Sequence, residues 1–428
     1  MERATASFAD NHIPFFGKTT FFFLGISALV GWNAILIGLD FFTKKFPDYN
    51  YSFYVSIPML IATNLINLII HYLTRFMTMK TRIIIGLIGQ IVMLIIIPIQ
   101  AQFQQSSTGF YVSLLMIFME GCAISIVQSS SIAFASMCPP ECISIFFTGT
   151  GIGGVMIALF RAIMLGTIGA DSDNAIFLGT MIYFIVAAIF LLITIFMFLA
   201  FYKTDFCKYF LNKSNSRVSA INEPLHDEDP VFQIINTQEK TDVSHDEEVK
   251  KMLPEASKKD TKFILNVFKK IQPMPILIFL IYIQTFMMFP GVALTKQAMS
   301  DPAWNADLLV LVYNIGDSFG KYLAGFRNGY NVVSMTVLIL GRFLFYLSFL
   351  VMASSNNATV ISADWFAFVN MFVFSATNGY GTTAVMVLAP EITNKNEKET
   401  AGFIMNNGLY FGMMAGSFLA LIFQNVGK

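Results

Sequence analysis

Charged side chains are scarce in this sequence. Asp, Glu, Lys and Arg make up 13% of the 428 residues, whereas soluble domains contain about 25%. The 27 basic residues equal the 27 acidic ones, so net charge favours neither nucleic acid nor any strongly charged partner. Hydrophobic residues make up 55% of the chain and include 45 phenylalanines. This composition argues against a soluble domain and favours a protein embedded in a lipid bilayer.

Cysteine is also rare, and catalytic and metal-binding motifs are missing. The four cysteines fall in apolar stretches or on the expected cytoplasmic side, where disulfides seldom form. Cys138 and Cys142 have no second pair of ligands to complete a zinc site. The sequence contains no Walker phosphate-binding loop and no His-Glu-x-x-His motif. We therefore expect a protein that is not an enzyme and that has no cofactor and no metal site.

Long apolar runs are what the chain has in abundance. A membrane-spanning helix needs about 20 predominantly apolar residues, and eleven stretches of the chain reach that length. They predict an all-α polytopic membrane protein with eleven transmembrane helices. The predicted spans are 19–42, 51–73, 83–102, 110–136, 143–168, 175–202, 275–294, 306–326, 330–353, 364–389 and 400–424.

A polar stretch at 204–273 divides these spans into six and five. It lacks apolar periodicity, so we expect a largely disordered cytoplasmic loop with a short interfacial helix near 262–270. The domains are then a cytoplasmic N-terminus at 1–18, a six-helix half at 19–203, the loop, and a five-helix half at 274–428. Two such halves are typical of the major-facilitator-like architecture, in which the solute site lies between them.

Lys and Arg in the short loops predict the orientation of the chain. With a cytoplasmic N-terminus, eight such residues face the cytoplasm and four face outward, as the positive-inside rule requires. An odd number of crossings then places the C-terminus outside the cell. We expect a multi-pass protein of the plasma membrane.

The eighth span carries a carboxylate, an amide and an ammonium group on one helical face. Asp317 and Lys321 are four residues apart, and Asn314 stands three residues earlier. A carboxylate inside the bilayer costs several kcal/mol, and such residues commonly mark a solute pathway. The strip suits the hydroxyls and the heterocycle edge of a small polar solute. The alternative is an internal salt bridge that only neutralises Asp317.

The fourth span carries a second polar face. Ser125, Gln128 and Ser129 are spaced to line one side of a helix. The carboxamide of Gln128 can donate and accept hydrogen bonds, which the edge of a purine or pyrimidine requires. These side chains can equally join helices by interhelical hydrogen bonds, and the sequence leaves both interpretations open. Glu120 in this span and Arg161 in the next are expected to form a structural pair.

Several other positions suggest packing or bending of the spans. Trp32 and Asn33 lie in the middle of the first span, where an indole can stack on a flat base or fill the core. Pro290 removes a backbone hydrogen bond and marks a bend in the seventh span. The cluster Gly149-Thr150-Gly151-Ile152-Gly153-Gly154 matches the spacing of a dinucleotide fingerprint. No βαβ unit surrounds this cluster, so we interpret it as a helix-packing device.

In the order of its motifs along the chain and in its loop layout, the sequence resembles the equilibrative nucleoside transporter family over nearly all its spans. The residues that carry the resemblance are Trp32-Asn33, Gln128, the Gly149–Gly154 cluster, Arg161, Phe289-Pro290-Gly291-Val292, Asn314-x-x-Asp317-x-x-Gly320, Arg342, Asn378-Gly379-Tyr380 and Glu399-Thr400-Ala401-Gly402. The resemblance implies a facilitator-like fold. It further implies nucleoside contacts from Leu29, Trp32, Leu36, Gln128, Asp317 and Lys321.

In this comparison Gln128 would read the base, and Asp317 and Lys321 would bind ribose hydroxyls, with Asn314 beside them. Structural or gating roles are expected for Asn33, Arg161, Pro290, Arg342, Asn378 and Tyr380. One position departs from the family, because Lys321 stands where an Arg is usual. Lys is a point donor whereas Arg is a planar fork, so the sequence leaves nucleosides and nucleobases as competing substrates.

The function that we expect is facilitative transport of nucleosides, with purines preferred, by alternating access. The partners are the nucleoside or nucleobase and the lipid bilayer, without nucleic acid. Coupling to a proton through Asp317 or Glu120 is left open, because both carboxylates lie within spans. A sugar or drug carrier of the same architecture is the alternative. A membrane receptor or enzyme is disfavoured by the number of spans and the lack of paired catalytic groups.

Overall fold

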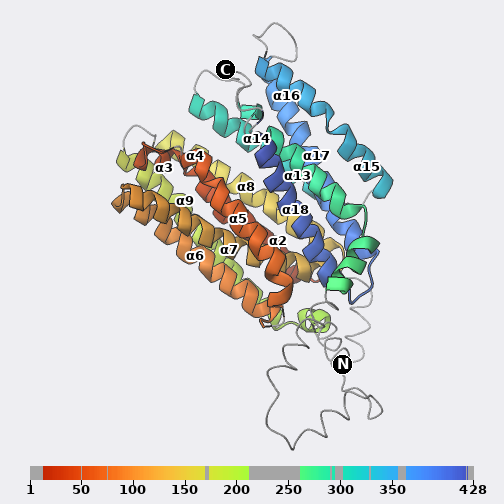
Figure 1. Cartoon of the computed structure of the whole chain (residues 1–428). Helices are drawn as coiled ribbons and strands as arrows, with labels where there is room; N and C mark the ends of the chain where they lie inside the picture. Colours follow the sequence, from red (N-terminus) through yellow and green to blue (C-terminus); the bar gives the residue numbers. More distant parts are fainter. Residues whose placement is uncertain are drawn as a thin grey trace, which may run out of the picture.

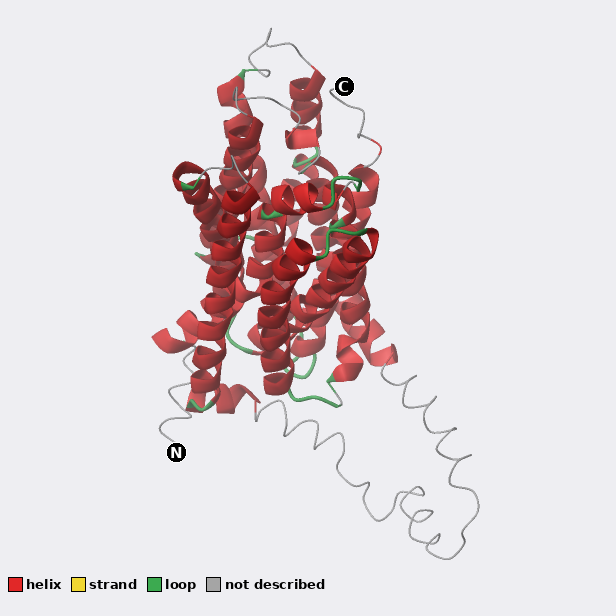
Figure 2. Cartoon of the chain, turned by 90° about the vertical axis from the view of Figure 1, so that its left-hand side faces the viewer, coloured by secondary structure: helices red, strands yellow, loops and turns green. Residues whose placement is uncertain are grey.

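The chain is all-helical in the part that the structure describes. The computed structural model describes residues 13–49, 51–74, 76–168, 173–211, 261–289, 292–294, 302–326, 329–354, 363–420 and 422. Within these ranges there are helices and no strand (Figure 2). The fold class expected from the sequence is therefore confirmed.

The N-terminal half contains six long helices. They are α2 (Phe15–Ile37), α5 (Ser56–Leu73), α6 (Met79–Phe103), α7 (Ser107–Met137), α8 (Glu141–Thr167) and α9 (Asp173–Tyr202). Two short helices, α3 (Leu39–Lys45) and α4 (Tyr51–Tyr54), lie between α2 and α5. The first span was expected at 19–42, but α2 begins four residues earlier and ends at Ile37, before Gly38.

The C-terminal half contains α13 (Met274–Met288), α14 (Pro302–Gly325), α15 (Val332–Gly341), α16 (Leu344–Ser354), α17 (Asp364–Glu391) and α18 (Lys398–Ala420). Figure 1 shows the two halves side by side, α2–α9 in red to yellow-green and α13–α18 in green to blue. The ninth predicted span, 330–353, is broken into α15 and α16 at Arg342. α13 ends at Met288, just before Pro290, which lies outside the described residues.

Length and hydropathy alone identify six of the described helices as able to cross a membrane, or seven if a bent pair counts as one. The bent pair joins the helix Thr261–Lys270 to α13 at 79°, so a helix does form where the sequence predicted one near 262–270. α14, α17 and α18 are not among the six. They carry buried polar side chains such as Asp317, Asn378 and Asn406, which lower their hydropathy.

The surface and the interior are divided as in a membrane protein. Large apolar side chains are exposed on the outer faces of helices, for example Leu68 on α5, Ile88 on α6 and Phe196 on α9. Buried polar side chains cluster inside, where other helices can satisfy them. The protein is thus an integral, multi-pass membrane protein with a polar interior.

Glycines allow α8 to lie between α2 and α14. A Cβ added to Gly149 would run into the Phe22 carbonyl oxygen of α2, and one added to Gly151 would lie 2.5 Å from Ser318 Oγ of α14. A Cβ on Gly154 would lie 2.9 Å from Asn314 Oδ1 of α14. The glycine cluster is therefore a packing device, as the sequence predicted. The structure adds that it brings a helix of one half against a helix of the other.

The glycine series of α18 serves the same purpose within the C-terminal half. A Cβ on Gly412 would lie 2.6 Å from the carbonyl oxygen of Phe279, and one on Gly416 would lie 2.8 Å from that of Ile283. Both carbonyls belong to α13. Side chains at these positions would separate the two helices.

Candidate substrate site between the two halves

Asp317 is buried on α14 and both of its carboxylate oxygens have partners. Its side chain is 10% exposed, and Oδ2 lies 2.6 Å from Nζ of Lys321, one turn later on the same helix. Oδ1 accepts a hydrogen bond of 2.8 Å from Nδ2 of Asn378 on α17. α14 and α17 approach closely because a Cβ on Gly379 or Gly320 would strike the facing backbone. The salt bridge that the sequence offered as the alternative interpretation thus forms, with an amide donor added from a second helix.

The polar strip of α14 faces the other half of the molecule. Lys321 Nζ donates to Thr150 Oγ1 of α8 at 3.0 Å. Two turns before Lys321, Asn314 Nδ2 donates to the carbonyl oxygen of Gly154, also on α8, at 3.4 Å. Asn314, Asp317 and Lys321 therefore share one face, as their spacing predicted, and that face lies at the boundary between the halves.

Arg342 lies behind this strip and is joined to it by two polar side chains. Its Nη2 donates to Thr285 Oγ1 at 2.8 Å, and this hydroxyl donates to Asn378 Oδ1 at 2.7 Å. Asn378 in turn donates to Asp317, so the guanidinium and the carboxylate are the two ends of one hydrogen-bond chain. We call Arg342, Thr285, Asn378, Asp317 and Lys321 the Asp317 network.

Arg342 is also held firmly in place. Nη1 donates to the Phe374 carbonyl at 2.8 Å and to Thr377 Oγ1 at 2.7 Å, and Nε donates to Gln284 Oε1 at 3.3 Å. The guanidinium carbon lies 4.7 Å from the centre of the Phe374 ring. The break between α15 and α16 places this side chain where α13 and α17 can both reach it. The sequence prediction missed Gln284 and Thr285, whose only signal was a pair of polar residues in an apolar span.

Gln128 belongs to a second network that also joins the halves. Its Oε1 accepts from the Tyr410 hydroxyl of α18 at 2.7 Å, and its Nε2 donates to Asn406 Oδ1 at 3.3 Å. Asn406 Nδ2 donates to Asn67 Oδ1 of α5 at 2.7 Å and to Ser129 Oγ at 2.8 Å. We call these five residues the Gln128 network. Its partners Asn67, Asn406 and Tyr410 were missed, because one sequence does not show which spans are neighbours.

The interhelical interpretation of Gln128 is therefore realised in this structure. It does not compete with a substrate role, because a carboxamide whose partners lie on the opposite half can exchange them for a solute. Within the described residues, no hydrogen bond joins the Gln128 network to the Asp317 network.

The candidate residues on α2 are half-buried. Leu29, Trp32 and Leu36 follow helical spacing and share a face of α2, and Trp32 packs against the core. Asn33 is half-buried beside it. Partial exposure of these side chains in the middle of a bundle is compatible with solute contact, and their role as substrate contacts stays a prediction.

Two further candidates lie apart from both networks, and one expected pair is absent. Arg161 is half-buried on α8, two turns beyond Gly154. Tyr380 is half-buried and meets Tyr330 edge to face, with ring centres 6.0 Å apart. The expected pair of Glu120 with Arg161 is wrong, because neither oxygen of Glu120 has a hydrogen-bond partner among the described residues.

The contacts between the halves lie toward one end of the bundle. We call it the Lys18 end, because Lys18 near the start of α2 and Glu141 at the start of α8 form an ion pair of 3.3 Å there. Arg82 near the start of α6 lies 3.4 Å from Glu399 near the start of α18. Close by, a Cβ on Gly402 of α18 would lie 2.7 Å from Ser136 Oγ of α7. Tight packing at this end joins the two halves directly.

A third ion pair lies at the same end. Lys270 Nζ lies 2.6 Å from Glu397 Oε2 in the turn before α18, and Glu397 also accepts from the backbone N–H of Asn394 at 2.8 Å. Partial burial raises the pKa of Glu397, but the hydrogen bonds and charge of Lys270 together with Asn394 outweigh it and lower the pKa below 4.5. The turn between α17 and α18 is thereby tied to the helix Thr261–Lys270.

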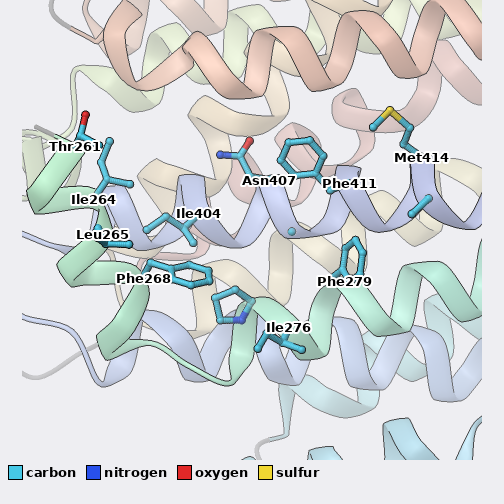
Figure 3. Close-up of a pocket in the computed structure, with 13 residues that line it drawn as sticks. Thr261, Ile264, Leu265, Phe268, Ile276, Phe279, Ile404, Asn407, Phe411 and Met414 are labelled. Carbon is cyan, nitrogen blue, oxygen red and sulfur yellow. The ribbon is translucent and has the colours of Figure 1, made fainter. Parts of the chain in front are cut away.

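An open cavity of about 660 Å³ lies elsewhere, between the helix Thr261–Lys270, α13 and α18. Figure 3 shows its lining, in which Phe268, Phe279 and Phe411 predominate and Asn407 is one of few polar side chains. An apolar lining of this kind offers little to the hydroxyls of a polar solute. None of the candidate substrate residues lines it, so the candidate site is the boundary between the halves.

Comparison with protein families matches residues 114–425 to a family model described as "Nucleoside transporter". Among curated relatives, "Equilibrative nucleotide transporter 4" of Arabidopsis thaliana is 26% identical over 416 residues, covering 95% of this chain and 93% of that protein. "Equilibrative nucleoside transporter 2" of Rattus norvegicus is 22% identical over 449 residues, covering 95% and 96%.

Solved structures show the same architecture at low sequence identity. A proton:xylose symporter of the major facilitator superfamily superposes with a TM-score of 0.63 at 12% identity, over 95% of this chain and 88% of that one. A bacterial homologue of the iron transporter ferroportin gives a TM-score of 0.59 at 12% identity, over 95% and 91%. These likenesses establish a major-facilitator-like fold.

Proposed function

Since this chain belongs to the nucleoside transporter family, we propose that it is a facilitative carrier that moves nucleosides, purines preferentially, by alternating access. The observation that carries the proposal is the Asp317 network, which presents a carboxylate, an ammonium and an amide on α14 toward α8 of the other half. Membrane transport is the activity of the family, and the choice of nucleoside rests on the chemistry of this strip.

The Asp317 network supplies complementary groups for a ribose. Two vicinal hydroxyls can donate to the carboxylate of Asp317 and accept from the ammonium of Lys321. The salt bridge of 2.6 Å keeps both charges paired while the site is empty of solute, so the carrier does not have to bury a lone carboxylate between transport events. Asn378 and, behind it, Arg342 hold the carboxylate in position.

The Gln128 network supplies the base-reading group. A purine edge presents both acceptors and donors, and the carboxamide of Gln128 has one of each. In this conformation they are engaged by Tyr410 and Asn406 of the opposite half. Exchange of these bonds for bonds to a base would link solute binding to the separation of α7 from α18.

The arrangement of contacts suggests which side is closed. Lys and Arg are more frequent in the loops on the side of the N-terminus, so we assign the Lys18 end to the cytoplasm and the opposite end to the exterior, in the plasma membrane. The ion pair Arg82–Glu399 and the packing of Ser136 against Gly402 then close the cytoplasmic side. Both contacts must break for the solute to leave into the cell.

Uptake by purified full-length protein in liposomes tests this function. We expect saturable, sodium-independent uptake of radiolabelled adenosine, which Asp317→Asn and Gln128→Ala each reduce strongly. The matched control is Asp205→Asn, which removes a carboxylate that is 81% exposed. Normal uptake in both site variants at equal protein level would contradict the site. Absence of adenosine uptake in the wild type would contradict the function.

A nucleobase is the second candidate substrate. It is favoured by the small number of N–H donors of Lys321 that remain for a ribose. An ammonium has three donors, of which two are engaged by Asp317 and Thr150. Only one donor remains for ribose. Competition of labelled adenosine by inosine, hypoxanthine and glucose separates the candidates. Stronger competition by hypoxanthine than by inosine would favour the nucleobase, and competition by glucose a carrier of sugars.

A further inference from the structure

Glu120 is a buried carboxylate to which the described part of the chain offers no hydrogen-bond partner. It is the fourteenth of the 31 residues of α7, so it lies near the middle of that helix. Its side chain is 0% exposed, and neither Oε1 nor Oε2 has a hydrogen-bond partner among the described residues. On the neighbouring helix α6, Gln90 is also 0% exposed, and both ends of its carboxamide lack partners in the same part of the chain.

These two side chains meet at one point on a third helix. A Cβ added to Gly31 of α2 would lie 3.3 Å from Gln90 Oε1 and closer still to Glu120 Oε1. The carboxyl group and the carboxamide therefore converge on the backbone of Gly31. We call Gly31, Gln90 and Glu120 the Glu120 cluster.

Close helix packing shields this cluster. A Cβ on Gly89 of α6 would lie 3.2 Å from Ala123 of α7, and one on Gly121 of α7 would lie 2.9 Å from Ala62 of α5. With small residues on both sides, the three helices leave little room for a large ligand. A group that binds here must be small and must satisfy oxygen atoms.

No described cation pairs with Glu120. The charged groups on the helices around it are Lys18 on α2, Lys80 and Arg82 on α6, Glu141 and Arg161 on α8, and Lys398 and Glu399 on α18; the His71 side chain on α5 lies outside the described residues. Lys18 and Arg82 pair with Glu141 and Glu399, and Lys80 lies over the Tyr202 ring.

A metal ion is a poor fit for this cluster. It needs several oxygen ligands, and the described residues contain no group of three acidic, His or Cys side chains that could hold one.

We propose that Glu120 is a proton-binding site of the carrier, and that its proton is taken up and released during the transport cycle. The proposal rests on the transport function proposed above and changes it in one respect, because a carrier that binds one proton per cycle can use a proton gradient and is then not purely facilitative. The step is a reversible association, in which one carboxylate and one proton give one carboxylic acid and no other bond breaks. In the closed arrangement of α2, α6 and α7 the neutral acid is favoured, because an isolated carboxylate in apolar surroundings is far more costly.

The position of the cluster connects the proton to the solute. Gly31 precedes Trp32, which is one of the α2 residues proposed to contact the nucleoside. The hydroxyl of a protonated Glu120 can donate to Gln90 Oε1, which would join α7 to α6 at the point where both side chains face Gly31 of α2. Loss of the proton places a negative charge against the α2 backbone, which favours movement of this segment and entry of water. Solute binding on α2 and proton binding on α7 are thereby coupled.

Uptake under an imposed pH gradient tests the proposal with the full-length protein in liposomes. For one proton per nucleoside, an inward gradient of one pH unit supports about tenfold accumulation. We expect this accumulation in the wild type and in Asp205→Asn. In Glu120→Gln we expect uptake down the nucleoside gradient to persist and accumulation to be lost. Gln90→Leu removes the acceptor beside the acid. Uptake by this variant should therefore be half-maximal at a different pH from uptake by the wild type.

The outcomes separate this proposal from the function on which it rests. The proton site is overturned if wild-type uptake is unaffected by the pH gradient, or if Glu120→Gln still accumulates the nucleoside. Neither result contradicts the carrier function. Accumulation driven by sodium instead of protons overturns it in favour of a metal cation. If Glu120→Gln fails to fold, an unshifted pH response in Gln90→Leu overturns it. A wild type that takes up no nucleoside at any pH removes the function and the proton site together.

Discussion

The two halves of the molecule each bury a carboxylate, but the surroundings of the two carboxylates differ. Asp317 on α14 has an ammonium on one oxygen and an amide on the other, with a guanidinium at the far end of the same chain. Glu120 on α7 has neither a cation nor a hydrogen-bond donor among the described residues. A carboxylate whose oxygens are paired can exchange those partners for the hydroxyl groups of a solute, whereas an isolated one in apolar surroundings is stabilised by a proton. These surroundings are the basis for proposing that Asp317 binds the solute and that Glu120 binds a proton.

The largest expected effect is on transport in Asp317→Asn. The substitution leaves the Lys321 ammonium without its anion, and the single oxygen of the new carboxamide has to replace the two oxygens that now serve Lys321 and Asn378. Loss of a hydrogen bond to a charged group costs about 1.5–3 kcal/mol, so we expect initial uptake to fall about 10- to 150-fold. The measurement is initial uptake of labelled adenosine at equal reconstituted protein. Uptake within twofold of wild type would contradict the proposal that Asp317, unlike Glu120, binds the solute.

Substitution of Arg342 is expected to lower the stability of the protein more than its rate of transport. Arg342→Met leaves the Phe374 carbonyl and the Thr285 and Thr377 hydroxyls without their donor. Breaking a buried charged network costs about 3–5 kcal/mol, so the Tm in detergent should fall by several degrees. Glu120→Gln is the informative comparison. It breaks no described hydrogen bond, and its Tm should equal or exceed that of the wild type.

A smaller effect is expected at the contact between α7 and α18. Tyr410→Phe removes one hydrogen bond of 2.7 Å to Gln128 and little else. A single neutral bond contributes about 0.5–1.5 kcal/mol, so the balance between closed and open states should shift about two- to tenfold. Accessibility of a cysteine introduced at Ser136 to a membrane-permeant maleimide measures this shift. Unchanged labelling would mean that the Gln128 network does not hold the halves together.

The smallest effect concerns pH and the Lys270–Glu397 pair. The folded-state pKa of Glu397 is lowered from 4.5, so the stabilisation is complete above about pH 4.5 and is lost as the pH falls through the lowered value. Exposed pairs contribute at most about 1 kcal/mol. Wild type and Lys270→Met should therefore differ slightly in Tm at pH 7 and converge toward pH 3. A difference in Tm between wild type and Lys270→Met that grows as the pH falls would contradict the expected direction.

Much of the candidate site followed from spacing along single helices. Asn314, Asp317 and Lys321 are placed on one face by helical geometry alone, and the structure keeps them there. The glycine cluster of α8 was recognised as a packing device because a span leaves no room for a βαβ unit. Asn378 was expected to have a structural or gating role, but the sequence named no partner for it. Its bond to Asp317 depends on the approach of α14 to α17, which no spacing along one helix predicts.

The failed expectation is instructive for the same reason. Glu120 and Arg161 have opposite charges and lie in consecutive spans, but consecutive spans do not determine which faces meet. Glu120 faces Gly31 and Gln90 instead. The missed residues Thr285, Asn406 and Tyr410 likewise gain their meaning from helices distant in sequence.

The sequence by itself determined that the chain crosses the membrane repeatedly, that it has two halves, and which helix faces are polar, because these follow from length, hydropathy and helical period. Only the tertiary structure decided which polar faces meet. The polar side chains in the spans have no water to solvate them, so each depends on whichever helix packs against it. That packing gives Asp317 a donor from Asn378 in addition to Lys321 of its own helix, and it leaves Glu120 beside a glycine and an amide.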